Sequence, residues 1–216
     1  MKKGFFLMII IAACLLSSCH GGFFEDGNGH LVTTERDVAA FDRLKIKGCA
    51  EVHYHYSKEQ LVEVTVDSNL DDATDIYVKK GVLIVSERRG WHDFTRYVVD
   101  VYTPDLAGVE IEGSGDFFTD DDIDTHTFTA DIEGSGKITV SGVCDNLEVE
   151  ISGSGDFNGQ GITISHAEVE INGSGNVRLC VTSYLHVEIN GSGDVYYRGN
   201  PQLSTDVNGS GDIKMW

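Results

Sequence analysis

Apolar and polar residues alternate with a period of two through the second half of the chain, and each alternating stretch ends at a Gly-Ser-Gly turn. Such alternation places the apolar side chains on one face of a strand. A repeat of 18 to 21 residues with strand patterns on both sides of a glycine turn is typical of a β-solenoid. The sequence therefore predicts an all-β fold of stacked coils, each with a strand, a Gly-Ser-Gly corner, a second strand and a return loop. The first glycines of the six corners are Gly113, Gly134, Gly153, Gly173, Gly191 and Gly209.

The expected core consists of the residues six, four and two positions before each of these glycines. At the corner, glycine tolerates a positive φ and has no Cβ to clash with the next coil. Six copies within strand patterns exclude a flexible linker, and no copy is followed by the Lys-Ser or Lys-Thr of a phosphate loop. The core positions are Ala107, Val109, Ile111, Phe128, Ala130, Ile132, Leu147, Val149, Ile151, Ala167, Val169, Ile171, Leu185, Val187, Ile189, Leu203 and Val207, with Thr205 as one polar substitution.

The first half of the chain is less regular. Residues 44–52 resemble a degenerate copy of the corner unit, and Lys80-Gly81 is typical of a hairpin turn. We expect one β-solenoid domain over residues 37–216, with irregular coils over 37–106 and regular repeats over 107–216. Further strands are expected at 62–66, 75–78, 82–86 and 97–102, with a short helical turn near 69–72.

The N-terminus has the features of a secretory signal. Two lysines precede an apolar run that is too short to span a bilayer. Its end, Leu-Ser-Ser-Cys, resembles a bacterial lipoprotein box, which implies cleavage after residue 18 and lipid attachment, including palmitate, at Cys19. The alternative is an ordinary signal peptide with a chance cysteine. We expect a signal peptide over 1–18, a flexible glycine-rich tether over 19–36 and a lipid anchor in the bacterial outer membrane.

The chain is strongly acidic, with 35 Asp and Glu against 16 Lys and Arg, a net charge of −19. This charge disfavours nucleic acid and anionic lipid surfaces as partners. Divalent cations and basic surfaces remain open. Three cysteines follow Cys19, and an odd number at irregular spacing is no disulfide framework. One pair could form a disulfide, but small buried thiols are the favoured interpretation of Cys49, Cys144 and Cys180.

Stacking in register would align the residue three positions before each first glycine into an acidic column at about 4.8 Å spacing. Stacked like charges are destabilising. The column is therefore either a solubility stripe that protects the sheet or a binding site for divalent cations or a basic partner. The asparagines at 172, 190 and 208 could form an amide ladder. A calcium β-roll is disfavoured because its motif recurs every nine residues. The column contains Glu110, Asp131, Glu150, Glu170, Glu188 and Asp206.

One basic and aromatic cluster falls in a loop between two expected strands. Such side chains suit contact with a sugar or a peptide, but the loop could equally cover an open end of the solenoid. His53 and His55 share one strand face and could begin a metal site, although exposed histidines are the simpler interpretation. No catalytic constellation is evident, so we expect neither an enzyme nor a cofactor. The loop cluster contains Arg88, Arg89, Trp91, His92, Phe94 and Arg96.

The chain resembles the bacterial family described as putative auto-transporter adhesin, head GIN domain. The resemblance rests on residues 38–44, 80–85 and 99–106 and on the Gly-Ser-Gly-Asp corners. It implies a right-handed parallel β-helix-like fold and a secreted or lipid-anchored protein of Bacteroides-like bacteria. Cys49-Ala50 departs from the usual Ser-Gly at the first corner. We expect an envelope protein whose solenoid surface binds a glycan or protein ligand, the alternative being a β-helix enzyme acting on polysaccharide.

Overall fold

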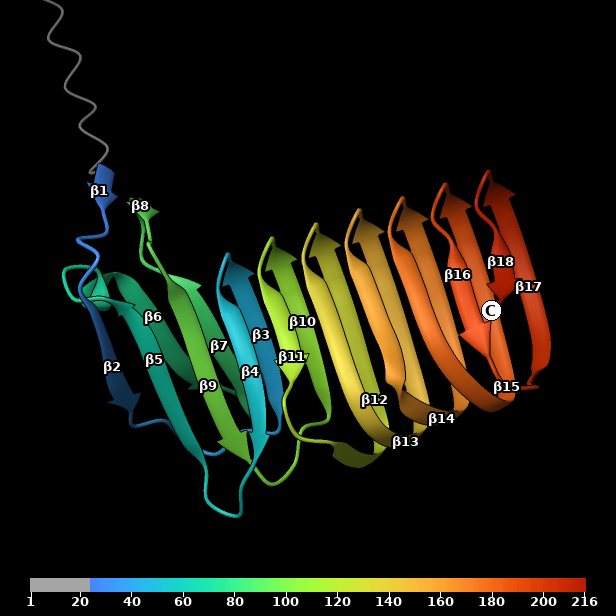
Figure 1. Cartoon of the computed structure of the whole chain (residues 1–216), viewed down its shortest axis with the longest axis horizontal. Coiled ribbons are helices and arrows are strands. Elements are labelled where there is room, and N and C mark those ends of the chain that lie inside the picture. Colours follow the sequence, from blue (N-terminus) through green and yellow to red (C-terminus); the bar gives the residue numbers. More distant parts are fainter. Residues whose placement is uncertain (1–23) are drawn as a thin grey trace, which may run out of the picture.

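The computed structural model describes residues 24–216 as one continuous β-solenoid (Figure 1). Strands make up 71% of it, and the solenoid has about five turns. Within the described chain, the helical content is one 3-10 turn, η1 (Asp71–Ala73), and no helix there could span a membrane. The predicted all-β, parallel coiled fold is confirmed.

Each coil has two layers that meet at a Gly-Ser-Gly corner. We call the strands that run into the corners the inbound layer and those that leave them the outbound layer. The longest strands bend through the return and so contribute to both layers. These are β12 (Ile123–Gly134), β13 (Lys137–Gly153), β14 (Asp156–Gly173) and β15 (Asn176–Gly191). The purely inbound strands are β3 (Arg43–Gly48), β10 (Gly108–Gly113) and β17 (Gln202–Gly209), and the purely outbound strands are β4 (Glu51–Tyr56), β11 (Asp116–Thr119), β16 (Val195–Arg198) and β18 (Ile213–Met215).

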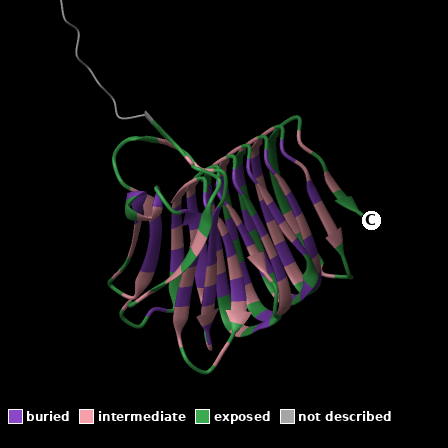
Figure 2. Ribbon diagram, turned by 60° about the vertical axis from the view of Figure 1, so that its left-hand side comes forward, coloured by how far each residue is buried: buried purple, intermediate pink, exposed green. Residues whose placement is uncertain are grey.

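The coils pair in parallel and keep their corners in register. Gly48 lies beside Gly113, and every later corner glycine pairs with its equivalent. Buried and accessible residues alternate along the strands as bands across the stack (Figure 2). Most predicted core positions are buried, but Leu203 and Val207 are each 41% exposed because no described strand covers the last coil.

The corner glycines are required for two different reasons. Gly153 has φ 137°, and a Cβ there would overlap the carbonyl oxygen of Gly134. Gly155 needs no positive φ, but its Cβ would lie 2.6 Å from the carbonyl oxygen of Gly136. The following aspartate then supports the next coil: Asp156 accepts a hydrogen bond from the backbone N–H of Asn176 at 2.9 Å. The corner motif is therefore a stacking device.

The N-terminal end of the solenoid is closed by antiparallel strands (Figure 1). The coil formed by β3 and β4 is followed outward by β7 and β9, which pair with it in parallel. Two further strands, β5 and β6, are joined through η1. β5 pairs antiparallel with β9, and β6 pairs antiparallel with β7, so these two strands end the parallel stack. Leu70, beside η1, is fully buried in this end. The four strands are β5 (Leu61–Asp67), β6 (Thr74–Lys79), β7 (Val82–Glu87) and β9 (Tyr97–Thr103).

The flexible tether expected up to residue 36 is wrong for its second part. Residues 24–36 contain β1 (Phe24–Asp26) and β2 (Leu31–Arg36). β2 pairs antiparallel with β5, and Arg36 forms an ion pair with Asp71 at 2.6 Å. The alternating pattern of β2 supplies one more strand for the sheet edge, which outweighs the polar composition. The predicted signal peptide, Cys19 and the start of the tether lie outside the described residues.

The close stacking of the corners predicts a large stability cost for Gly153→Ala. Both the positive φ and the overlap with the coil below should act, so we expect a loss of about 3 kcal/mol or more in urea unfolding. Gly29→Ala is the matched control, because Gly29 has φ 74° with nothing within 4 Å of the added Cβ. It should lose only about 1 kcal/mol. Equal losses for the two variants would contradict the stacking account.

Candidate functional site

The predicted acidic column exists on the outward face of the inbound layer. Strand pairing places Glu110 beside Asp131 and carries the column on to Asp206 without a register shift in this layer. All six carboxylates are half-buried or exposed. A second acidic column, two residues earlier, includes Glu148 and Glu168 on the same face.

Neighbouring side chains compensate the carboxylates at both ends of the column, by opposite charge at one end and by hydrogen bonds at the other. At the N-terminal end, the Lys45 ammonium donates to Glu110 and Glu112 at 2.5 Å each. Towards the other end, asparagines two residues further along each strand donate their amides to the column carboxylates. These contacts are Asn172 to Glu170 at 2.7 Å, Asn190 to Glu188 at 2.9 Å and Asn208 to Asp206 at 3.3 Å. The amide ladder expected here is limited to one hydrogen bond, from Asn208 to Asn190 at 3.3 Å.

The middle of the column lacks this compensation. The side-chain carboxylates of Asp131 and Glu150 have no hydrogen-bond or ion-pair partner among residues 24–216. Partial burial, together with the charges of Glu150 and Glu110, raises the pKa of Asp131 to about 6. Within the column, Asp131 is therefore the position where burial and like charges together oppose ionisation most clearly.

A shallow groove of about 210 Å³ runs beside the column. Within the described chain, no group of three or more His, Cys, Asp or Glu is arranged to hold a metal ion. Cation binding by the column therefore stays a prediction. The groove is lined by Glu148, Val149, Glu150, Glu168, Val169, Glu170, His186 and Glu188.

The predicted ligand loop is an expanded corner. It connects β7 to β9, just as Gly48-Cys49-Ala50 connects β3 to β4 in the adjoining coil. Its short strand β8 (Trp91–Asp93) pairs with β1. The buried carboxylate of Asp67 fixes its base by accepting the backbone N–H of Thr95 at 2.8 Å. The loop therefore lies beside the N-terminal end without closing it, since β5, η1 and β6 do that.

The loop residues do not form one site. Phe94 packs on the core and stacks on Tyr97, with ring centroids 4.9 Å apart. Trp91 is 72% exposed, and Arg88 and Arg89 are also exposed. His92 lies 5.9 Å from the Phe94 ring, whereas Arg96 lines a different pocket, that of the histidine cluster described next.

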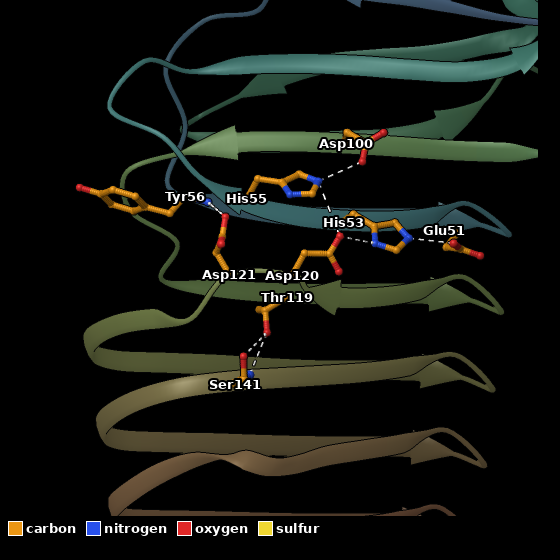
Figure 3. Close-up of polar contacts among 9 residues, drawn as sticks. All are labelled: Glu51, His53, His55, Tyr56, Asp100, Thr119, Asp120, Asp121 and Ser141. Atoms are coloured by element: carbon orange, nitrogen blue, oxygen red, sulfur yellow. Dashed lines mark hydrogen bonds and ion pairs between the residues drawn. The ribbon is translucent and has the colours of Figure 1, made fainter.

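His53 and His55 form a charged cluster on the outward face of the outbound layer (Figure 3). His53 contacts Glu51 through Nε2 at 2.7 Å and Asp120 through Nδ1 at 3.0 Å. His55 Nε2 lies 3.0 Å from Asp100 Oδ1. It also lies 3.7 Å from Asp120 Oδ2, the oxygen that His53 contacts. The cluster joins β9, β4 and the end of β11, and so spans three successive coils.

The cluster favours a protonated His53. Both ring nitrogens face carboxylates, and only an imidazolium can donate from both. Burial alone would lower the pKa of His53, but the contacts with Glu51 and Asp120 outweigh it and raise the pKa above the ordinary value of 6.5. Because both nitrogens are engaged, neither is free to act as a general base. The sequence favours His53 and His55 as simple exposed histidines, whereas the structure places both in a network with carboxylates.

The three described cysteines Cys49, Cys144 and Cys180 are unpaired. Cys144 is buried, as expected for a small structural thiol. For Cys49 the expectation of a buried thiol is wrong, because the residue is exposed at the first corner. Partial desolvation of its sulfur and its hydrogen bond to Glu87 nevertheless raise the pKa of the thiol to about 11.

A second basic and aromatic group escaped the sequence analysis. Arg178, Tyr196 and Lys214 lie side by side on the outward face of the last three outbound strands. The aligned corners could have found them, because each is the third residue after the second glycine of its corner. Their types differ from coil to coil, so no repeated motif marks them.

The fold and its sites place the chain in the class of β-solenoid proteins, with outward faces that run in register along the stack. Residues 40–201 match the family model described as putative auto-transporter adhesin, head GIN domain. The chain belongs to this family. A comparison with curated proteins finds no match.

Several solved structures of bacterial proteins have a similar fold. The crystal structure of a putative adhesin from Bacteroides fragilis is 18% identical, covers 88% of this chain and 99% of that one, and has a TM-score of 0.75. A putative adhesin from Parabacteroides merdae is 22% identical over 89% and 99% of the two chains, with a TM-score of 0.56. A putative lipid binding protein from Parabacteroides distasonis is 25% identical over 88% and 98%, with a TM-score of 0.53.

Removing the uncompensated charge in the acidic column should stabilise the protein. Asp131 ionises above about pH 6 in the folded chain, against 3.8 ordinarily, so its cost is present above pH 6 and disappears as the pH falls towards 4. Asp131→Asn should therefore gain about 1–2 kcal/mol at pH 8 in low salt. The gain should vanish below pH 4, and salt should reduce its charge-repulsion part. Asp124→Asn, an exposed position outside the column, is the control, and an equal gain there would refute the argument.

The histidine cluster predicts a loss of stability on mutation at low pH, where the Asp131 variant is expected to have little effect. Because the folded pKa of His53 is raised, its stabilising contribution is complete below about pH 6.5 and is lost as the pH rises through the folded pKa. His53→Gln should therefore destabilise at pH 5.5, by less than about 1 kcal/mol, and have a smaller effect at pH 9. His126→Gln is the control, because His126 is 79% exposed in its pair with Asp145. Stability curves that stay parallel to wild type for His53→Gln would rule out the coupling.

Proposed function

We propose that this chain is a lipid-anchored protein of the bacterial outer membrane that binds a ligand on the outward faces of its solenoid, without catalysis. The family and its structural neighbours support an adhesion-type role at the cell envelope. The observation that carries the proposal is the register of the coils, which repeats outward side chains along two unbroken faces. Such faces suit an extended ligand better than a small molecule, which binds in concave pockets.

The proposed anchor is the lipid on Cys19. The described chain begins with β1, beside the closed N-terminal end (Figure 1). A lipid a few residues earlier would hold that end near the membrane and leave the regular coils further away. The acidic inbound face would be repelled by anionic lipid headgroups, which keeps it available for cations or for a basic partner.

The test separates anchorage from binding. Full-length Cys19→Ala should leave the membrane fraction or accumulate as uncleaved precursor, because the sulfur is the proposed lipid acceptor. Bacteria carrying it should lose attachment to immobilised glycans or matrix proteins, while the protein itself, purified and spread on the same array, should still bind.

Normal processing and unchanged detergent partitioning of Cys19→Ala would overturn the anchor. Absence of any ligand on the array, with no loss of attachment on deletion of the protein, would overturn the adhesive role. Turnover of a polysaccharide by the purified chain would overturn the non-catalytic role.

A further inference from the structure

Two rows of basic and aromatic side chains cross the last three outbound strands. In the first row, Arg178 of β15 lies beside Tyr196 of β16, which lies beside Lys214 of β18. In the second row, Arg198 follows Tyr196 by two residues, and Trp216 follows Lys214 by two. The backbone N–H of Trp216 bonds to the Tyr197 carbonyl at 3.1 Å and so extends the ladder. We call these five residues the arginine–aromatic surface.

Each arginine is held by an aromatic ring of the next coil. The guanidinium carbon of Arg178 lies 5.2 Å from the centre of the Tyr196 ring, and that of Arg198 lies 5.5 Å from the Trp216 ring. The Tyr196 hydroxyl donates to Asp194 at 3.0 Å, which fixes that ring. Stacking leaves the N–H edge of a guanidinium free to bind a carboxylate or sulfate in two-point fashion.

Neither guanidinium is neutralised within the described chain. The guanidinium groups of Arg178 and Arg198 have no ion-pair or hydrogen-bond partner among residues 24–216. The ammonium of the nearby Lys214, by contrast, is paired with Asp212 at 2.7 Å. In a chain with 35 acidic residues against 16 basic ones, two oriented and unpaired arginines on rigid strands are suited to a negatively charged ligand.

The lysines and arginines of the regular coils all lie on one face, which also carries the corner aspartates Asp116, Asp156, Asp194 and Asp212. Residues 107–216 contain only four basic residues, Lys137, Arg178, Arg198 and Lys214, and all of them lie on the outbound face. The acidic column lies on the inbound face. An anionic ligand is therefore repelled from the inbound face, and on the outbound face the unpaired guanidiniums of Arg178 and Arg198 are the groups suited to bind it.

We propose that the arginine–aromatic surface binds an anionic polysaccharide, through its carboxylate or sulfate groups at the arginines and its sugar rings at the aromatic side chains. The proposal rests on the proposed ligand-binding function and names the ligand class. Strand spacing and rise place Arg178 and Arg198 about 8 Å apart along a diagonal of the sheet, so an extended chain can contact both. Trp216, 39% exposed, provides a ring surface for the sugar. Nucleic acid is disfavoured by the acidity of the whole chain.

The test is a titration of the full-length chain, purified in detergent, with polygalacturonate, heparin and neutral dextran. We expect binding of at least one of the two anionic polymers, weakened by salt, and none of dextran. Arg178→Gln/Arg198→Gln should weaken it at least tenfold, and Trp216→Leu should weaken it less. Lys137→Gln removes one positive charge elsewhere on that face and should change binding less than twofold, whereas each single arginine variant should weaken binding by more than that. Unchanged melting temperatures establish that the variants are folded.

Three binding patterns would overturn the inference, and so would the absence of binding to both anionic polymers. One is equal binding of dextran, and another is equal loss with Lys137→Gln. The third is equally tight binding of polyglutamate, which would make the surface a site for acidic protein. If neither anionic polymer binds but the array finds another ligand, the inference fails while the proposed function stands. If nothing binds and attachment is unaffected by deletion of the protein, both fail.

Discussion

Successive coils approach closely at the corners. The carbonyl oxygen of each corner glycine occupies the space that a Cβ would need on the equivalent glycine of the next coil. This contact recurs from Gly48 to Gly209 and pins the register of each coil to its neighbour. Because the register is fixed at the corner, inward residues remain inward for the whole strand, and equivalent isoleucines stack in the core with no exposed surface at five successive coils. These are Ile111, Ile132, Ile151, Ile171 and Ile189.

The same register imposes a cost on the outward faces. Carboxylates stacked on neighbouring strands repel one another. A cation or a hydrogen-bond donor beside a carboxylate reduces this cost. Lys45 supplies one at the first level and the asparagines supply others towards the C-terminal end. The outbound face solves the problem differently, because its corner aspartates accept backbone N–H groups from the next coil. The molecule thus has one face with surplus negative charge and one with free arginines.

The regular coils could be predicted from the sequence because their information is local. Each corner lies within a few residues of the strands it joins, and counting from its glycine gives both the core and the acidic column. The N-terminal part could not be ordered in this way. The order β5, β9, β4 results from pairing between segments distant in sequence, and no repeat marks it. Lys45 could be recognised as a partner of Glu110 only once β3 was placed beside β10.

The candidate sites were predictable to the extent that they follow the repeat. The acidic column does. The histidine cluster does not, because Asp100 and Asp120 reach His53 and His55 from two different neighbouring coils. The loop between β7 and β9 was recognised by its composition, but its position as an enlarged corner depends on the pairing of both flanking strands.

The irregularities between coils lie at the return bends. The register shifts between Thr139 and Ser141, between Gly159 and Thr163, and between Ile164 and His166. The inbound strands beyond these bends pair without interruption up to each corner. The bends therefore absorb differences in coil length, and one extra residue there leaves every column intact. Within a strand, the same insertion would turn the inward side chains outward. The outward faces can consequently lengthen or shorten only in steps of one whole coil, about 4.8 Å at a time.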